Sequence, residues 1–286
     1  MRIIEVVPYN PKWPQLFEEE AALIKKALGD NCIAIYHVGS TSVPGLNAKP
    51  IIDILPVVKD ILEVDHRTKA MENLGYVAKG ENGMAFRRFF QKGGTVKTHN
   101  VHVYEQGDPE IDRYVKFRDW MRSHRDDREA YAKLKKELAA KFPHDILSYC
   151  NGKDAFVASI DDKDGYEGWR MVQALTDREW AAVSALHQTA SNEKDHIHFV
   201  FYKNADIIGY AHLQLLPKHQ AILHVIVMDN QDWKARFLKL CERWLVHQGF
   251  KMLVVQSTPE TYPFFCNQGY SKSGSPADSQ SSKVLT

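Results

Sequence analysis

The segment HVGSTSVPGLNAKPIIDIL, residues 37–55, constrains the fold of this chain more than any other feature. It predicts two apolar strands joined by a turn that carries Gly39 and Ser40, and the second strand holds one acid, Asp53. A Gly-Ser step at the end of a strand lets backbone amides and a hydroxyl face a phosphate. A lone carboxylate in an apolar strand is costly to bury unless it is paired or binds a cation. The segment therefore predicts a phosphate-and-metal site.

Length and composition limit the classes of protein to which the chain can belong. Its 286 residues, 44% of them hydrophobic, are enough for two domains with cores of their own. The 37 basic and 36 acidic residues give a net charge of +1, which indicates neither nucleic acid nor a membrane as a partner. The sequence has no apolar run of about 18 residues and no signal-peptide pattern. Four scattered cysteines favour free thiols in the cytoplasm.

A charge-rich stretch, DDKDGYEG, predicts a linker between the two domains. Strands followed by long helices are expected before it, and short strands alternating with helices after it. We therefore predict an α/β (α+β) chain with a first domain over 1–165 and a second domain over 166–273. The small and polar residues 274–286 predict a disordered tail.

The first domain holds the residue types that phosphoryl or nucleotidyl transfer requires, namely groups that bind phosphate oxygens and a metal ligand. Asp53 is both the candidate metal ligand and a candidate catalytic residue, and the alternative is a structural acid that caps a local turn. Leu55, two places further along the strand, shares its face and leaves the predicted Mg²⁺ or Mn²⁺ site one acid short. The candidate phosphate or nucleotide ligands are Gly39, Ser40, Thr41, Lys49, Arg87 and Arg88.

His102, in a predicted strand over 96–104, is the second candidate metal ligand. It shares a strand face with Asn100, whereas His99 points to the other side. A histidine beside Asp53 would suit a transition metal better than magnesium. The alternative is that both histidines are hydrogen-bonded residues of a half-buried sheet.

The central motif, together with HNVHVY, YVKFRDWMRSH and LKKELAAKF, resembles the GrpB family over residues 1–165. That family is grouped by fold with the nucleotidyltransferase superfamily. The resemblance maps the Gly-Ser step of the superfamily to Gly39 and Ser40, its first catalytic aspartate to Asp53 and its second to Leu55. It implies the fold strongly and the activity weakly.

The second domain is similar to the GNAT acyltransferase superfamily over about residues 168–272, through IIGYAHLQLL, ILHVIVM, FLKLCERWLVHQGF and PFFCNQGY. This resemblance implies that the start of a long helix binds the pyrophosphate of acetyl-CoA or another acyl-CoA. Two glycine positions of the family pattern are occupied here by Lys234 and Arg236, whose side chains crowd the backbone while their charge attracts phosphates. The candidate acyl-CoA ligands are Val227, Gln231, Lys234, Ala235 and Arg236.

Acyl transfer also needs a base for the amine and an acid for the leaving thiolate. His224 is the candidate base, and the alternative is a hydrogen-bonded core histidine. The acid of the family is the second residue of a Phe-Tyr pair, which is Phe265 here, so Tyr262 or Cys266 would have to replace it. Little chain follows Tyr270 for the closing strands, which the partner in a homodimer could supply.

Three functions remain open from the sequence. The leading hypothesis is an acyl-CoA-dependent N-acyltransferase acting on a small molecule, with a nucleotide- or phosphate-binding first domain. The second is a nucleotidyl- or phosphotransferase acting through the first domain. The third is a non-catalytic sensor that kept two pockets and lost their chemistry. The alternating histidines His196 and His198 are interpreted as surface decoration.

Overall fold

The computed structural model describes residues 3–186, 193–204, 206–272 and 280–286. The chain divides into two compact units, Met1–Asn82 with Phe86–Trp169, and Gly83–Ala85 with Arg170–Thr286. The sequence places the boundary at 165 and does not show that Gly83–Ala85 joins the second unit. Among the described residues, no helix is both long and apolar enough to cross a membrane.

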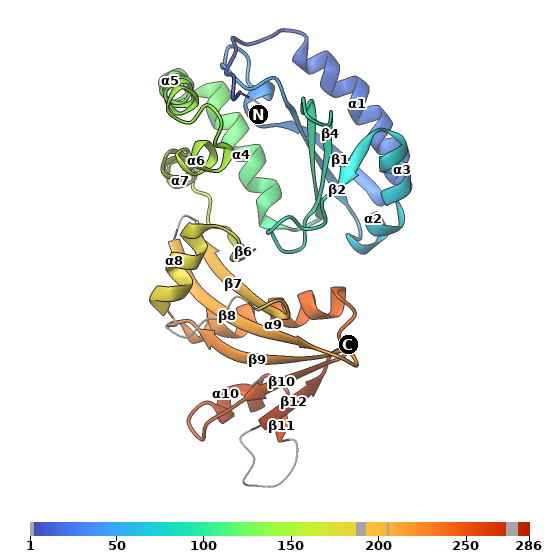
Figure 1. Cartoon of the computed structure of the whole chain (residues 1–286), viewed down its shortest axis with the longest axis vertical. Coiled ribbons are helices and arrows are strands. Elements are labelled where there is room, and N and C mark those ends of the chain that lie inside the picture. Colours follow the sequence, from blue (N-terminus) through green and yellow to red (C-terminus); the bar gives the residue numbers. More distant parts are fainter. Residues whose placement is uncertain (1–2, 187–192, 205, 273–279) are drawn as a thin grey trace. The chain divides into compact units, whose positions relative to one another are not determined.

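A five-stranded mixed sheet, in the order β1-β2-β5-β4-β3, forms the centre of the first unit. Only β2 and β5 run parallel among its neighbouring strands. Figure 1 shows α1 to α3 on one side of this sheet and α4 to α7 on the other. The strands are β1 (Cys32–Val38), β2 (Ile52–Val58), β3 (Tyr76–Ala78), β4 (Arg88–Lys92) and β5 (His99–Glu105).

The helices of the first unit follow from local signals in the sequence. Apolar side chains at helical spacing place Phe17, Ile24 and Leu28 in the core against the sheet. Asp108 caps the next long helix by accepting a hydrogen bond from the backbone N–H of Glu110, as the sequence predicts. The helices are α1 (Trp13–Leu28), α2 (Leu62–His66), α3 (Thr68–Asn73), α4 (Pro109–Ser123), α5 (Arg125–Lys141), α6 (Ile146–Asn151) and α7 (Asp154–Lys163), with 3-10 turns at Gly29–Asn31 and Ser40–Ser42.

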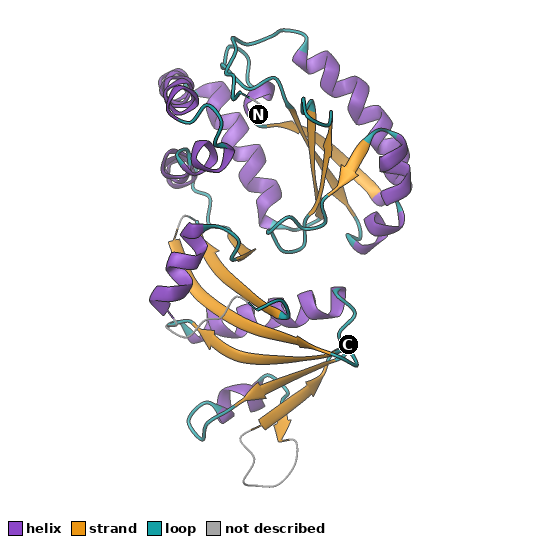
Figure 2. Cartoon of the chain, viewed as in Figure 1, coloured by secondary structure: helices purple, strands orange, loops and turns teal. Residues whose placement is uncertain are grey.

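The second unit is built on a seven-stranded sheet in the order β11-β12-β10-β9-β8-β7-β6. Residues Gly83–Ala85 join it through a bridge between Met84 and Val172. Figure 2 shows helices on both faces of the sheet. The strands are β6 (Trp169–Gln173), β7 (His196–Lys203), β8 (Asp206–Leu216), β9 (Gln220–Val227), β10 (Met252–Gln256), β11 (Ser271–Lys272) and β12 (Gln280–Val284). The helices are α8 (Asp177–Leu186), α9 (Gln231–His247) and α10 (Tyr262–Asn267).

Strands β9 and β10 are parallel and pair over only part of their length. Within the described part of the sheet, their pairing ends at Leu223 opposite Val255, although β9 continues to Val227. Figure 2 shows the two strands diverging toward their C-terminal ends, where α9 begins. The backbone edge of residues 224–227 therefore faces an opening in the sheet rather than a paired strand.

The prediction of a disordered tail is wrong for its last part. Residues Gln280–Val284 form β12, which lies between β10 and β11 and is antiparallel to both. Backbone hydrogen bonds order this segment whatever the polarity of its side chains, and Ser281 is fully buried. The closing strands therefore come from this chain itself, whereas residues 274–279 lie outside the described residues.

Candidate functional site

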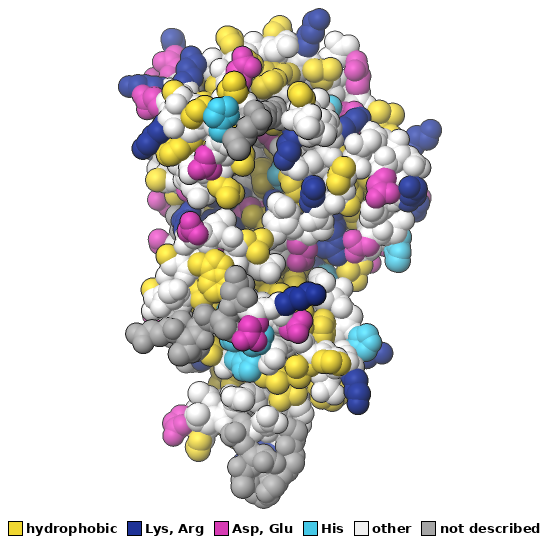
Figure 3. All heavy atoms as spheres, viewed as in Figure 1, with side chains coloured by type: hydrophobic (Ala, Val, Ile, Leu, Met, Phe, Trp, Pro, Cys, Tyr) yellow, Lys and Arg dark blue, Asp and Glu magenta, His cyan; other side chains and the backbone are white. Residues whose placement is uncertain are grey.

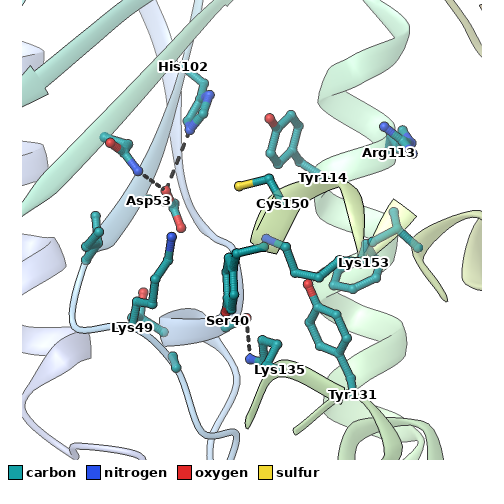
Figure 4. A pocket seen from close by; sticks show the side chains of 18 residues that line it. Ser40, Lys49, Asp53, His102, Arg113, Tyr114, Tyr131, Lys135, Cys150 and Lys153 are labelled. Carbon is teal, nitrogen blue, oxygen red and sulfur yellow. Dashed lines mark hydrogen bonds and ion pairs between the residues drawn. The ribbon is translucent and has the colours of Figure 1, made fainter. Parts of the chain in front are cut away.

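The first unit contains a cavity of about 420 Å³ next to the central motif. The turn after β1 and strands β2 and β5 form one wall, and helices α4 to α7 form the other. Figure 4 shows lysine, histidine and tyrosine side chains from both walls around the carboxylate of Asp53. The volume lies within the range of pockets that hold small-molecule ligands.

Asp53 lies at the start of β2 and is the one carboxylate among the described residues that line the cavity. The side-chain amide of Asn100 donates to its Oδ1 at 2.9 Å, and His102 Nε2 lies 3.6 Å from the same oxygen. Burial raises the pKa of this carboxyl, but His102, Asn100 and the charge of Lys49 lower it further. The pKa of Asp53 is thus below its usual range, and the group is ionised at neutral pH.

His102 presents a proton to Asp53. Its Nδ1 lies 3.5 Å from a guanidinium nitrogen of Arg87, which can only donate, so Nδ1 is the acceptor and Nε2 carries the hydrogen. Burial and the charge of Arg87 lower the pKa of His102, which keeps the ring neutral. With Leu55 buried in the core, Asp53 alone offers a carboxylate, and its neighbours donate toward it. This donor set does not fit the predicted Mg²⁺ or Mn²⁺ site, nor a metal bound between Asp53 and His102.

Gly39 makes the approach of the turn to Asp53 possible. Its φ of +68° is in the left-handed region, and a Cβ at this position would lie 2.5 Å from Asp53 Oδ2. Ser40 and Thr41, the next two residues and predicted phosphate ligands, also line the cavity. The Thr41 hydroxyl lies 3.0 Å from His37 Nε2, so it also fixes the turn against β1.

Lys135, on α5, is the main residue of the site that the sequence analysis missed. It is 2% exposed, and its ammonium donates to Ser40 Oγ at 2.7 Å and to the carbonyl of Asn47. Burial, together with the charges of Lys153 and Lys49, lowers its pKa to about 7. A bound anion would stabilise the charged form of a lysine whose pKa is lowered by burial and by cationic neighbours.

Lys49 and Lys153 complete a group of three lysines. Each ammonium lies 4.8 Å from the centroid of the Tyr149 ring. Figure 4 shows the ammonium of Lys49 directed toward Asp53. Arg113, a fourth cation in the wall, is paired with Asp161 at 2.8 Å. The charge of the residues that line the cavity is therefore positive.

The structure does not bring the predicted ligands Arg87 and Arg88 to the cavity wall. The guanidinium of Arg87 donates to the backbone carbonyls of Glu81 and Asn82. Arg88 makes two hydrogen bonds to the carboxylate of Asp65, at 2.6 and 2.7 Å. Arg87 reaches the site only through His102, and Arg88 supports the fold.

The predicted acyl-CoA ligands of the second unit gather around the start of α9. Gln231 is the first residue of this helix, and Asn230 caps it by accepting a hydrogen bond from the N–H of Trp233. The ammonium of Lys234 lies 5.2 Å from the ring centroid of Phe264 on α10, and burial lowers its pKa. The other predicted ligands are Val227 at the end of β9, and Ala235 and Arg236 within α9.

The predicted catalytic residues Tyr262 and His224 lie on α10 and β9, not on α9. Tyr262 is the first residue of α10, and a hydrogen bond with Cys266 raises its pKa. His224 shares a hydrogen bond of 3.0 Å with Gln214 and stacks against the ring of His196. The interpretation of His198 as surface decoration is wrong, because it is 2% exposed and bonds to the Tyr210 hydroxyl.

The first unit combines a mixed α/β sheet with a cavity lined by its own residues, and the second unit has a separate mixed sheet with helices of its own. A model of the GrpB protein family matches residues 3–163, more than half of the chain, and the chain therefore belongs to the GrpB family. UPF0157 protein YqkA of Bacillus subtilis (strain 168) is 47% identical over 161 residues, which cover 56% of this chain and 47% of that protein. The chain thus spans about half the length of this relative.

Two solved structures resemble the two units. The crystal structure of GrpB from Enterococcus faecalis is 42% identical, with a TM-score of 0.54, and the match covers 56% of this chain and 96% of that one. A putative N-acetyltransferase from Lactobacillus plantarum matches at 19% identity and a TM-score of 0.37, over 41% of this chain and 99% of that one. The predicted α/β class is confirmed by the two mixed sheets and their helices, and the predicted GrpB-like fold of the first unit by the match to the Enterococcus faecalis structure.

Proposed function

We propose that the first unit binds a small molecule that carries a phosphate next to an apolar or aromatic body. The observation that supports this proposal is the convergence of Lys49, Lys135 and Lys153 on one cavity that contains a single carboxylate. Phosphate oxygens accept the hydrogen bonds that ammonium groups and the hydroxyl of Ser40 can donate. Tyrosine and phenylalanine rings in the same wall offer faces for a nucleobase or another flat ring.

Binding of a phosphate would also relieve the strain between like charges. The pKa of Lys135 is lowered to about 7 by burial and by its two lysine neighbours, so part of the population has lost this charge at neutral pH. A phosphate within the group would raise that pKa again, and binding would take up a proton from solution. Affinity is therefore expected to fall as the pH rises above about 7.

Calorimetric titration with AMP, ATP, inorganic phosphate and adenosine, in the presence of EDTA, tests the proposal. We expect the phosphates to bind and adenosine to bind at least about tenfold more weakly, equivalent to ~1.4 kcal/mol. Lys153→Met should reduce the affinity by a similar factor, whereas Lys136→Met, which removes an exposed lysine of α5, should leave it unchanged. Equal binding of AMP and adenosine would contradict the proposal.

Asp53→Asn separates this function from metal-dependent nucleotidyl transfer. Removing the carboxylate makes the cavity more positive, so the affinity for AMP should increase if the lysines bind the phosphate directly. A catalytic metal held by Asp53 would instead be lost, together with any Mg²⁺- or Mn²⁺-dependent binding. The transferase hypothesis is the less well supported, because Leu55 stands where a second carboxylate would be needed.

For the second unit, we propose acyl-CoA-dependent N-acyl transfer as the function that its sheet supports best. The specific observation is the opening between β9 and β10 with α9 beginning beside it. The backbone of residues 224–227 can pair with the amide groups of pantetheine as a strand would. In this proposal the first turn of α9 and the ammonium of Lys234 bind the pyrophosphate.

In this reaction the amine of the acceptor attacks the thioester carbonyl, the carbon–sulfur bond breaks, and the amine proton leaves to a base while the thiolate of CoA takes one up. Tyr262, beside Cys266 on α10, is the proposed acid. Isothermal titration with acetyl-CoA and a thiol-release assay with an amine panel test binding and turnover separately. Lys234→Met should weaken binding, whereas Lys239→Met, exposed on the same helix, should not. Binding without turnover on any amine would favour the sensor hypothesis.

A further inference from the structure

Three histidines from neighbouring strands of the second unit form a compact cluster. His196 lies on β7, His212 on β8 and His224 on β9, and one nitrogen from each lies within 4.8 Å of the others. It is the one group of three potential metal ligands of this kind found among the described residues. Figure 3 shows histidine side chains gathered on the face of the second unit that is in view, next to acidic side chains.

The registers of the strands explain how the three rings meet. His212 is paired with Val225, and the register shifts between His212 and Leu213, so that His224 lies in the irregular part of β9. A bulge of this kind turns the next side chain onto a different face. The ring centroids of His212 and His224 lie 4.8 Å apart, and those of His196 and His212 lie 4.9 Å apart.

We propose that His196, His212 and His224 bind a divalent transition-metal ion, with zinc as the reference ion. Imidazole is a ligand that zinc, copper and nickel prefer. Nδ1 of His196 lies 2.6 Å from Nε2 of His212, so these two nitrogens already face each other. Two nitrogens bound to one tetrahedral Zn²⁺, with bonds of ~2.0–2.1 Å, lie about 3.3 Å apart. A small separation of the two rings would therefore admit the ion.

Two further contacts orient the rings in the manner of a metal site. Glu193 Oε2 lies 3.6 Å from Nε2 of His196, the nitrogen on the other side of the ring from His212. Gln214 Oε1 lies 3.0 Å from Nε2 of His224, and an oxygen acceptor there selects the tautomer that keeps a lone pair on Nδ1. Acceptors that hold the second nitrogen of a ligating histidine fix its tautomer and increase its basicity.

Three protein ligands leave one position of a tetrahedral ion for water or a substrate atom. His196 and His224 are only partly buried, so solvent reaches the cluster. His224 is also the first residue of β9 beyond its last pair with β10, which places the cluster at the rim of the opening in the sheet. An ion here could polarise a bound carbonyl or lower the pKa of a bound water. The metal site does not depend on the proposed acyl transfer.

Titration of the full-length, EDTA-treated protein with Zn²⁺ and Co²⁺ tests the proposal. We expect one equivalent to bind, and the Co²⁺ form to show the visible absorption of a tetrahedral site with nitrogen ligands. His212→Gln and His224→Gln should each lower the Zn²⁺ affinity by at least about tenfold to a hundredfold. His144→Gln, which removes an exposed histidine of the first unit, should leave the affinity unchanged.

The outcome does not depend on one variant being folded. Far-ultraviolet circular dichroism checks each variant, and the Co²⁺ spectrum of the unmodified chain is a measurement that needs no variant. No uptake of either ion by the unmodified chain would overturn the proposal. So would Zn²⁺ affinities that are equal in the unmodified, His212→Gln and His224→Gln proteins. Acetyl-CoA titrations are read separately, so that failure of the metal site and failure of acyl transfer can be distinguished.

Discussion

The Lys135→Met substitution removes a buried ammonium whose protonation the fold opposes. The pKa of Lys135 is about 7 in the folded chain and has an ordinary value of 10.5 when exposed. Between these values the unfolded chain binds a proton that the folded chain does not, so the free energy of unfolding rises with pH. Integrated from about pH 7 to about pH 9, this single group contributes roughly 2 kcal/mol to the unmodified protein.

The methionine variant lacks this dependence, so its stability relative to the unmodified protein should change by about 2 kcal/mol over that interval. At pH 7 the variant gains stability because no charge has to be buried at this position, although the Ser40 hydroxyl and the Asn47 carbonyl lose a hydrogen-bond donor. Urea unfolding at both pH values, followed by fluorescence and circular dichroism, measures the difference, with Lys136→Met as control. If the unmodified and Lys135→Met proteins respond equally to pH, the pKa of Lys135 is not lowered and the reasoning is wrong.

Three other substitutions give predictions of their own. Gly39→Ala places a methyl group against Asp53 on a backbone with φ of +68°. It should lower the free energy of unfolding by about 2 kcal/mol, as measured in a thermal melt, and should also weaken AMP binding. Arg88→Met loses two hydrogen bonds to Asp65 and should lower the free energy of unfolding by about 2 kcal/mol without changing the affinity for AMP. A weakened affinity would show that Arg88 does take part in phosphate binding. Burial lowers the pKa of His37 from 6.5 to about 4. Between these two pH values the unfolded chain binds a proton that the folded chain does not, so acidification from 6.5 to about 4 should lower the free energy of unfolding by about 3 kcal/mol. His37→Gln should remove most of that loss, measured by urea unfolding, and an unchanged acid sensitivity would rule out His37 as its source.

The part of the site that lies within one motif could be predicted from the sequence. Gly39, Ser40 and Asp53 are neighbours because a turn and two adjacent strands join them, and local patterns describe turns and strands well. Lys135 comes from a helix far along the chain, so no local pattern connects it with Ser40. A signal was nevertheless present, because Lys135 lies four residues after Tyr131 and so shares the buried face of α5.

Two kinds of error have physical causes that the sequence does not display. The charge of Arg88 suggests a phosphate ligand, but the sequence does not show that its partner Asp65 comes to it from a different element. The histidine cluster depends on the registers of three strands, including a shift that no hydropathy pattern shows. Likewise, β12 is ordered by pairing with β10 and not by the apolarity of its residues.

The position of β12 between β10 and β11 has a consequence for how the second unit matures. While the ribosome is still synthesising residues 280–284, the edge of β10 that pairs with β12 is unpaired, and β11 lacks the strand through which it joins the sheet. Unpaired edges recruit strands from other molecules. Nascent or C-terminally shortened copies should therefore be captured by chaperones or aggregate, whereas copies that have added this strand should become soluble.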